Sequence, residues 1–351
     1  MFRPWRNRNR EPRWTTSLEN TDPLPTIDDI RAAAARLVGI AVRTPLLESE
    51  QLNARANARI LLKCEMFQPV GAFKIRGAWN MIAQIPEDQR ERGIVAFSSG
   101  NHAQAVAWSG RRLCIPTTIV MPADAPAIKI ANTRALGADV VLYDRTADDR
   151  EAIASEVVKR TGACIVPPYD HHDIIAGQGT VGLEIAEQCA ERGIEPDITI
   201  VPCSGGGLIA GCALALKDAL PGMSVYAAEP EQFDDTAKSL AAGTRVENAG
   251  RATSICDALM VPTPGKLTFA VNKDVLAGVL VVSDQYVRHA MYAAFTDARL
   301  VVEPGGAIGL AAALSESSLC AGRTICVVLS GGNTDPALFA EILESQSQNA
   351  P

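Results

Sequence analysis

From residue 59 onward, short runs of β-branched residues alternate with longer alanine-rich segments. The short runs have the composition of buried strands, and the longer ones have the length of helices. We expect strands at RILLKCE, GIVAF, TTIVM, ADVVLY, CIVP, DITIVP, SVYAAE and TICVVLS, separated by helices such as HAQAVAWSGRRL, AIKIANTRALG, IAGQGTVGLEIAEQCAERG and LIAGCALALKDAL. This alternation predicts an α/β fold with mainly parallel sheets and covering helices.

Two local signals mark helix starts. Thr26 is followed by Asp28 and Asp29, and a capping hydroxyl before an acidic first turn is typical of the start of a helix. Pro126 stands directly before AIKIANTRALG, where a proline suits the first helical position. We therefore expect helices to begin near both residues.

The length and composition limit the class of protein. With 351 residues, 47% of them hydrophobic, the chain can bury a large core in two domains or in one large composite. It has no run near the ~18 apolar residues that cross a bilayer, and residues 1–20 lack the apolar core of a secretory signal. We expect a soluble, cytoplasmic protein without a membrane partner.

The charge is distributed unevenly. The formal net charge is −7, yet residues 1–14 carry five arginines and one glutamate, so the remaining chain is acidic. An acidic body argues against nucleic-acid binding, because phosphate contacts require clustered basic residues. The basic segment has two prolines and almost no serine, so we expect residues 1–24 to form a disordered extension rather than a transit peptide.

Nine cysteines are scattered along the chain, and none forms a CxxC pair. Most lie in apolar segments, which favours buried, reduced thiols over a disulfide framework or a zinc site. Their positions are Cys64, Cys114, Cys164, Cys189, Cys203, Cys212, Cys256, Cys320 and Cys326.

The loop after GIVAF reads Ser-Ser-Gly-Asn-His over residues 98–102. In open parallel sheets, ligands bind where strand carboxyl ends meet helix N-termini. Free backbone N–H groups there attract anions, and the hydroxyl and amide side chains add donors for a small carboxylate. Ordinary helix capping by serine and asparagine explains the same residues.

The loop after DITIVP contains Ser204 and three successive glycines, followed by Leu208 and an alanine-rich helix. Glycines allow close approach of the backbone, and the helix dipole favours negative charge, so the loop predicts a phosphate cradle. A dinucleotide is one candidate, because Glu229 ends the next strand where a ribose-binding carboxylate would lie. The glycine spacing, however, matches neither GxGxxG nor GxxxxGK[ST].

Lys74 lies between Phe73 and Ile75, after a Pro-Val-Gly turn. A lysine among apolar neighbours loses hydration of its ammonium form, so its pKa falls and the amine becomes a nucleophile and base. Ser330 follows the strand TICVVL, where its hydroxyl can face a ligand or simply form a turn. A phosphate cradle, an isolated lysine, an anion-binding loop and a terminal serine can together hold pyridoxal phosphate as a Schiff base.

Seven motifs extend this interpretation: GAFKIRGA, SSGNHAQA, AGQGT, SGGGLIAG, AAEP, EPGGA and LSGGN. In order and spacing they resemble the serine/threonine dehydratase and serine racemase family, pyridoxal-phosphate enzymes of the tryptophan-synthase-β fold (fold type II). The resemblance runs from about residue 27 to 336. It implies two open, mainly parallel twisted sheets with helices on both faces, and a homodimer that acts on a small amino acid.

The same resemblance implies a domain arrangement. A large cofactor-binding domain would comprise residues 25–92 and 170–340, and a small domain would comprise residues 93–169. The cofactor would lie in the cleft between them, and residues 341–351 would be a C-terminal tail.

The resemblance also implies a role for each site residue. Lys74 would form the Schiff base, Asn101 would donate to the phenolic oxygen of the cofactor, Ser330 would face its pyridine nitrogen and Glu303 would lie close to it. The phosphate would be bound by Ser204, Gly205, Gly206, Gly207 and Leu208. The substrate carboxylate would be held by Ser98, Ser99, Asn101 and His102. In the racemase, the position of Ser99 supplies the acid or base opposite the lysine.

A divalent cation near AAEP is a further implication of the resemblance. Glu229 and Asp235 match its carboxylate ligands, and the backbone carbonyl of Phe233 would complete the protein's share. Hard oxygen ligands suit Mg or Ca. The alternative is a carboxylate that is hydrated by water at the end of a strand.

Two departures from the family pattern concern the site. Ala72 stands where the family usually has serine, so one hydroxyl near Lys74 is missing. His171 and His172 make the loop before AGQGT richer in histidine than usual. Either histidine could contact a second carboxylate of the substrate, but we expect solvated loop side chains.

These features predict β-elimination of a β-hydroxy amino acid such as L-threonine or L-serine to a 2-oxo acid and ammonia. A neutral serine opposite the pyridine nitrogen does not hold that nitrogen protonated, which favours prompt elimination. The chain ends soon after LSGGN, so we expect no C-terminal regulatory domain. The alternatives are a 3-hydroxyaspartate dehydratase, a serine racemase, a dehydratase of a hydroxyectoine-derived amino acid, an NAD-dependent oxidoreductase and an inactive binding protein.

Overall fold

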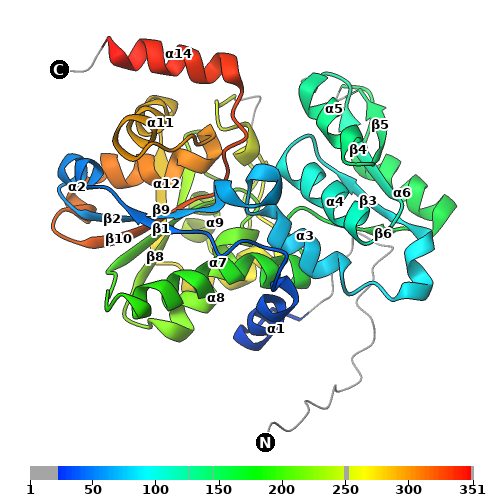
Figure 1. Ribbon diagram of the computed structural model, residues 1–351, viewed down its shortest axis with the longest axis horizontal. Helices are drawn as coiled ribbons and strands as arrows, with labels where there is room; N and C mark the ends of the chain where they lie inside the picture. Colours follow the sequence, from blue (N-terminus) through cyan, green and yellow to red (C-terminus); the bar gives the residue numbers. More distant parts are fainter. Residues whose placement is uncertain (1–22, 126, 145, 249–252, 349–351) are drawn as a thin grey trace, which may run out of the picture.

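A computed structural model describes residues 23–125, 127–144, 146–248 and 253–348. Pro126 and residues 1–22 of the basic extension lie outside these ranges, so the expectations for them are not addressed by the structure. The described residues form two sheets that lie in two lobes (Figure 1). The α/β architecture expected from the alternating pattern is therefore confirmed.

The larger sheet has six strands in the order β1-β2-β10-β7-β8-β9. The short strand β1 pairs antiparallel with β2, and the other neighbours are parallel. The strand bounds are β1 Leu46–Glu48, β2 Arg59–Cys64, β7 Ile198–Pro202, β8 Ser224–Pro230, β9 Gly278–Val282 and β10 Thr324–Leu329. Nearly all residues of β2, β7 and β10 are buried, as expected for central strands that helices cover on both faces.

The smaller sheet has four parallel strands in the order β5-β4-β3-β6. Their bounds are β3 Ile94–Phe97, β4 Thr117–Pro122, β5 Asp139–Tyr143 and β6 Cys164–Ile165. Figure 1 shows this sheet in a separate lobe with α4, α5 and α6, while α3 lies where the two lobes meet.

The helices cover both sheets and occupy most of the connections. Their bounds are α1 Ile27–Leu37, α2 Glu50–Ala56, α3 Lys74–Ile82, α4 Asn101–Arg112, α5 Ala127–Ala135, α6 Arg150–Thr161, α7 His172–Glu191, α8 Gly207–Ala219, α9 Asp235–Ala242, α10 Lys266–Val275, α11 Asp284–Ala298, α12 Pro304–Ser315, α13 Ser317–Cys320 and α14 Pro336–Ser347. The 3-10 turns are η1 Glu65–Phe67, η2 Pro69–Gly71, η3 Glu87–Arg92 and η4 Asp257–Leu259. None of the helices in the described ranges combines the length and apolarity needed to cross a membrane.

The start of α1 confirms the capping prediction. The Thr26 hydroxyl accepts from the backbone N–H of Asp29, and the Asp29 carboxylate accepts from the backbone N–H of Thr26. This reciprocal pair is a capping box, which satisfies two otherwise unpaired donors at the helix start.

The glycines of AGQGT serve helix packing. A Cβ on Gly179 would stand 2.8 Å from the carbonyl oxygen of Gly211, and one on Gly211 would stand 2.3 Å from that of Ile175. Helices α7 and α8 therefore approach backbone to backbone at these positions. This close contact places the start of α8 firmly against the middle of α7.

The structure adds elements that the sequence pattern did not indicate. Strands β1 and β9 were not predicted, and residues 341–347 belong to α14 rather than to a tail. Ile342 is fully buried, and Phe339 packs edge-on against Phe295 of α11, so this end of the chain gains apolar contacts that favour a helix. Eight of the nine cysteines are buried, as expected, while Cys114 is exposed.

Candidate active site

Lys74 is the first residue of α3 and lies at the wall of a cavity between the lobes. Its Nζ donates to the carbonyl oxygen of Pro168 at 2.6 Å and lies 5.1 Å from the centre of the Phe73 ring. Burial lowers the pKa of the Lys74 amine from 10.5 to about 8. A substantial share of the amine is therefore neutral near physiological pH, as the apolar sequence context predicted.

The cavity has a volume of about 270 Å³ and brings together every residue that was predicted to bind cofactor or substrate. Strands of both sheets end at it, because Phe97 closes β3 and Pro202 closes β7. The predicted residues that line it are Lys74, Ser98, Ser99, Asn101, His102, Ser204, Gly205, Gly206, Gly207, Leu208, Glu303 and Ser330. The rule that ligands bind at strand carboxyl ends located this cavity correctly.

The glycine loop forms the turn from β7 into α8. Gly206 has φ +91°, a left-handed conformation that side chains disfavour, and a Cβ on Gly205 would stand 2.3 Å from the Tyr169 ring. The loop can therefore lie flat against Tyr169 only if it carries no side chains. Its backbone N–H groups lead directly into α8, which has the geometry of an anion site at a helix N-terminus.

The loop over residues 98–102 precedes α4, which begins at Asn101. Gly100 occupies the capping position and offers no side chain, so simple capping does not account for these residues. The ring of His102 is buried, and its Nε2 lies 2.8 Å from the carbonyl oxygen of Val166. Burial, reinforced by the nearby Lys74, lowers the pKa of His102 to about 3. Its neutral ring is engaged with Val166, so His102 can assist an anion only through its backbone N–H.

Glu303 and Ser330 also line the cavity. The side-chain amide of Asn101 donates to Glu303 Oε1 at 2.7 Å, and burial raises the pKa of Glu303 from 4.5 to about 7. Ser330 directly follows β10, and its backbone carbonyl accepts from the N–H of Phe73 at 3.1 Å. The loop before Lys74 is thus attached to the end of the central strand β10.

Several residues that line the cavity were missed from the sequence. They are Phe97, Lys129, Arg150, Tyr169, Gln178 and Asp257. Lys129 forms an ion pair with Asp257 at 2.9 Å, and the guanidinium of Arg150 lies 5.4 Å from the centre of the Phe97 ring. One local signal was available for Arg150, since it is the first residue of α6, where the helix dipole disfavours a cation.

The predicted metal ligands lie apart from the cavity. Glu229 is the penultimate residue of β8, and its two carboxylate oxygens accept from the backbone N–H groups of Thr236 and Ala237 at 3.1 and 3.0 Å. Burial raises the pKa of Glu229 to about 7 and, with help from Glu229, that of Asp235 to about 8. Phe233 lies in the turn between β8 and α9. The described part of the chain holds no group of three histidine, cysteine, aspartate or glutamate side chains suited to a metal, so a Mg or Ca ion here stays a prediction.

The expectation of solvated histidines at residues 171 and 172 was wrong. Both side chains are only 2% exposed, and neither lines the cavity. His171 caps α7 by accepting from the backbone N–H of Asp173, and the His172 ring lies 3.2 Å from carboxylate oxygens of both Asp29 and Asp173. The partner on α1 is 143 positions away, so sequence alone could not place it.

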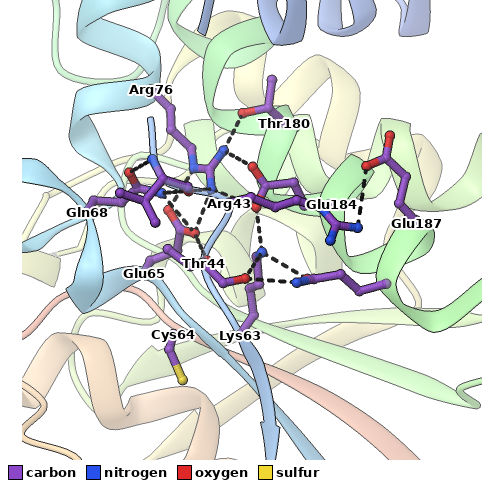
Figure 2. Close-up of polar contacts among 12 residues, drawn as sticks. Arg43, Thr44, Lys63, Cys64, Glu65, Gln68, Arg76, Thr180, Glu184 and Glu187 are labelled. Carbon is purple, nitrogen blue, oxygen red and sulfur yellow. Dashed lines mark hydrogen bonds and ion pairs between the residues drawn. The ribbon is translucent and has the colours of Figure 1, made fainter. Parts of the chain in front are cut away.

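A group of charged side chains links Arg76 of α3 to Glu65 and Glu184 (Figure 2). Arg76 is 1% exposed and binds the Glu65 carboxylate at 2.7 and 2.8 Å and the Glu184 carboxylate at 2.7 and 2.9 Å. Lys63 donates to Glu184 at 2.5 Å and to the carbonyl oxygen of Thr44 at 2.8 Å. Burial disfavours the charge on Arg76, but the two carboxylates raise its pKa overall. We call Lys63, Glu65, Arg76 and Glu184 the buried charge cluster.

The cavity fits pyridoxal phosphate. Lys74 offers a nucleophilic amine, the start of α8 offers N–H groups for a phosphate, and Ser330 offers a hydroxyl. Gln178 is 1% exposed and lines the cavity, yet neither polar atom of its side chain has a hydrogen-bond partner among the described residues. A buried polar group without a partner is costly, so a polar ligand is expected beside it.

Comparisons with known proteins agree with this fit. Residues 39–331 match the family described as pyridoxal-phosphate dependent enzyme. The chain is 39% identical over 323 residues to L-threo-3-hydroxyaspartate ammonia-lyase of Saccharomyces cerevisiae, covering 92% of this chain and 98% of that protein. It is 40% identical over 320 residues to serine racemase of Schizosaccharomyces pombe, covering 91% and 98%.

Solved structures show the same fold. The structure of maize serine racemase superposes with a TM-score of 0.86 at 39% identity, covering 93% of this chain and 99% of that one. The two mostly parallel sheets are those of the tryptophan-synthase-β-like fold, as the motifs predicted. The chain belongs to the family of pyridoxal-phosphate dependent enzymes.

Proposed function

We propose that this protein is an ammonia-lyase that converts a β-hydroxy amino acid into a 2-oxo acid and ammonia, with Lys74 as the residue that joins the cofactor. One observation carries the proposal: a single cavity combines an amine of lowered pKa, an anion-binding glycine turn and a second anion-binding helix start. This reaction class is supported by the names of two relatives, L-threo-3-hydroxyaspartate ammonia-lyase and serine racemase.

Each group in the cavity has a task. The N–H groups of residues 204–208 bind the cofactor phosphate, and the start of α4 binds the substrate carboxylate. When bound, pyridoxal phosphate supplies the electron sink that makes the Cα proton acidic. The Lys74 amine, when it is not bonded to the cofactor, would accept that proton, and a positioned base of this kind accelerates proton transfer by roughly 10²–10⁴-fold. The protonated Lys74 amine can give this proton to the β-hydroxyl, which then leaves as water, and hydrolysis of the enamine product yields the 2-oxo acid and ammonia.

A substrate panel tests the reaction. L-threonine, L-serine and both diastereomers of 3-hydroxyaspartate are incubated with the purified protein, and 2-oxo acid release and inversion of the amino acid are measured separately. We expect a yellow protein that releases a 2-oxo acid and loses turnover in Lys74→Ala but not in Lys273→Ala, which changes an exposed lysine of α10. A colourless protein, or full activity in Lys74→Ala, would contradict the proposal.

The cavity lining favours an acidic side chain on the substrate. Arg150 makes no ion pair within the described residues, and its guanidinium lies at the cavity wall above Phe97. A planar guanidinium without a carboxylate partner is suited to bind one from a ligand. We infer that 3-hydroxyaspartate is a better substrate than threonine, which has no second carboxylate.

Replacing Arg150 separates the two substrates. A lost hydrogen-bonded charge pair corresponds to roughly a 10- to 100-fold loss, so Arg150→Ala is expected to lower kcat/KM by that factor for 3-hydroxyaspartate and to leave threonine nearly unchanged. Arg160→Ala, which changes an exposed arginine of the same helix, serves as the matched control. Equal losses on both substrates would argue against recognition of a second carboxylate.

Racemisation is a second activity that Ser99 favours. Its position at the cavity wall, on the loop before α4, offers a hydroxyl in addition to the Lys74 amine. Inversion at Cα requires one group that removes the Cα proton and a second group that returns a proton to the opposite face. If Ser99 has this role, Ser99→Ala abolishes formation of the inverted amino acid while 2-oxo acid release persists, and loss of both activities would contradict it.

A further inference from the structure

Asn333 and Asn101 form a chain of hydrogen bonds from the loop before Lys74 to the cavity. Asn333 follows β10, and its Nδ2 donates to the carbonyl oxygen of Val70 at 2.8 Å and to Oδ1 of Asn101 at 2.8 Å. Nδ2 of Asn101 in turn donates to Glu303 at 2.7 Å. The chain joins residues of both lobes, because Asn101 begins α4 while Val70, Glu303 and Asn333 belong with the larger sheet.

The direction of this chain follows from its first acceptor. A backbone carbonyl can only accept, so Asn333 must turn its Nδ2 toward Val70. The second N–H of Asn333 then points at Asn101, so Oδ1 of Asn101 must be the acceptor. The amide of Asn101 is thereby held with its own donor toward Glu303 and the cavity that both residues line. An ionised Glu303 accepts from the same amide, so Asn333 and Glu303 together determine which end of Asn101 is the donor, and Asn333 alone determines it when Glu303 is protonated.

The backbone is shaped to admit Asn333. A Cβ on Gly71 would stand 2.6 Å from Oδ1 of Asn333, and Gly71 itself has φ +71°. The N–H of Gly332 donates to the carbonyl oxygen of Gly71 at 3.0 Å, and Ala72 bridges antiparallel to Gly331. The loop before Lys74 and the loop after β10 therefore hold Asn333 in one place.

We propose that Asn333 is a positioning residue that keeps the N–H of Asn101 directed at the bound cofactor, an inference that rests on the proposed function. The phenolic oxygen of pyridoxal phosphate is adjacent on the ring to the aldehyde carbon that the Lys74 amine takes. Asn101 and Lys74 line the same cavity. With pyridoxal phosphate bound, a donor at Asn101 would be available to the phenolic oxygen, and Asn333 favours the orientation of the amide that presents this donor.

Binding of two ligands to the apoprotein tests this role. The dissociation constant is measured by fluorescence titration for pyridoxal phosphate and for an analogue that lacks the phenolic oxygen. We expect Asn333→Ala to weaken pyridoxal phosphate about 10-fold, as for the loss of one hydrogen bond, and to weaken the analogue less than 2-fold. Asn132→Ala, which replaces an exposed asparagine of α5, should change neither value.

A second comparison excludes a merely structural effect. If Asn333 acts through Asn101, the double variant Asn101→Ala/Asn333→Ala binds pyridoxal phosphate as Asn101→Ala alone does. Equal losses for both ligands, additive losses in the double variant, or no loss in Asn333→Ala would each overturn the proposal. Failure of the wild-type apoprotein to bind pyridoxal phosphate would instead contradict the proposed function.

Discussion

Replacing Lys74 by methionine is expected to stabilise the apoprotein at neutral pH. Burial lowers the pKa of Lys74 from 10.5 to about 8, so the folded state holds this ammonium less readily than the unfolded chain does. The fall of this pKa from 10.5 to about 8 corresponds to at most about 3.4 kcal/mol at pH 7, where the amine is mainly protonated in both states. Methionine has a similar length and carries no charge, so the variant escapes this cost.

The pH dependence gives the sharper expectation. Between pH 8 and 10.5 the folded amine is neutral while the unfolded one is still charged, so the wild-type apoprotein gains stability relative to the variant as pH rises. The difference should shrink from about 3 kcal/mol at pH 7 to about 1.4 kcal/mol at pH 9.5. Additional apolar contacts of the methionine would change the stability difference equally at pH 7 and at pH 9.5, so the dependence of this difference on pH would remain.

Urea unfolding of both apoproteins at the two pH values measures this difference. Lys273→Met, at an exposed position of α10, serves as the control and should change the free energy of unfolding by less than about 0.5 kcal/mol. The idea of a desolvated amine would be refuted if the difference in free energy of unfolding between wild type and Lys74→Met stayed constant with pH. It would also be refuted if the variant were less stable than wild type at pH 7. The same desolvation leaves about a quarter of the amine neutral at pH 7.5, against about 0.1% for an ordinary lysine.

Three further predictions concern other parts of the molecule. Arg76→Met removes the shared partner of the Glu65 and Glu184 carboxylates and should lower the free energy of unfolding by about 3–5 kcal/mol. The control Arg59→Met breaks an exposed ion pair and should lower it by less than about 1 kcal/mol. Urea unfolding measures both values. Gly206→Ala places a methyl group on a residue with φ +91°, 2.8 Å from the side-chain amide of Asn272, and should weaken pyridoxal phosphate binding to the apoprotein at least about 10-fold. The control Gly222→Ala adds a methyl group with no atom within 4 Å and should leave binding unchanged. Burial raises the pKa of Glu303 from 4.5 to about 7, so the unfolded state releases this proton first and the stability of the wild type falls as pH rises between those values. Over that interval, Glu303→Gln should therefore gain about 3 kcal/mol in free energy of unfolding relative to wild type. A difference in unfolding free energy that stays constant with pH would contradict the raised pKa.

The main elements of the fold could be predicted because their signals are local. The parallel strands β2, β7 and β10 are continuous apolar runs, and their burial on both faces leaves a strong pattern. β1 has only three residues, and most residues of β9 are partly exposed, so neither strand gives a strong pattern. The start of α7 was misjudged because His172 is buried against Asp29 of α1, which is far away in the sequence.

The candidate site divides in the same way. The glycine turn and Lys74 could be found from sequence because each needs an unusual local residue for a physical reason: no side chains for close approach, or an amine without hydration. Lys129, Gln178 and Asp257 could not, since they reach the cavity only when distant segments pack together. Lys129 and Asp257, for example, are 128 positions apart and form their ion pair across the two lobes.

The buried charge cluster restricts how this sequence can change. Its two cations and two anions balance, and their side chains are at most 15% exposed, so a substitution that removes one charge leaves an unpaired charge in the interior, which is strongly destabilising. Such a variant would fall below the stability that natural proteins retain in reserve. In a directed-evolution library, changes at these four positions should survive only in compensating pairs, and random single substitutions there should be eliminated even though none of the four side chains lines the cavity.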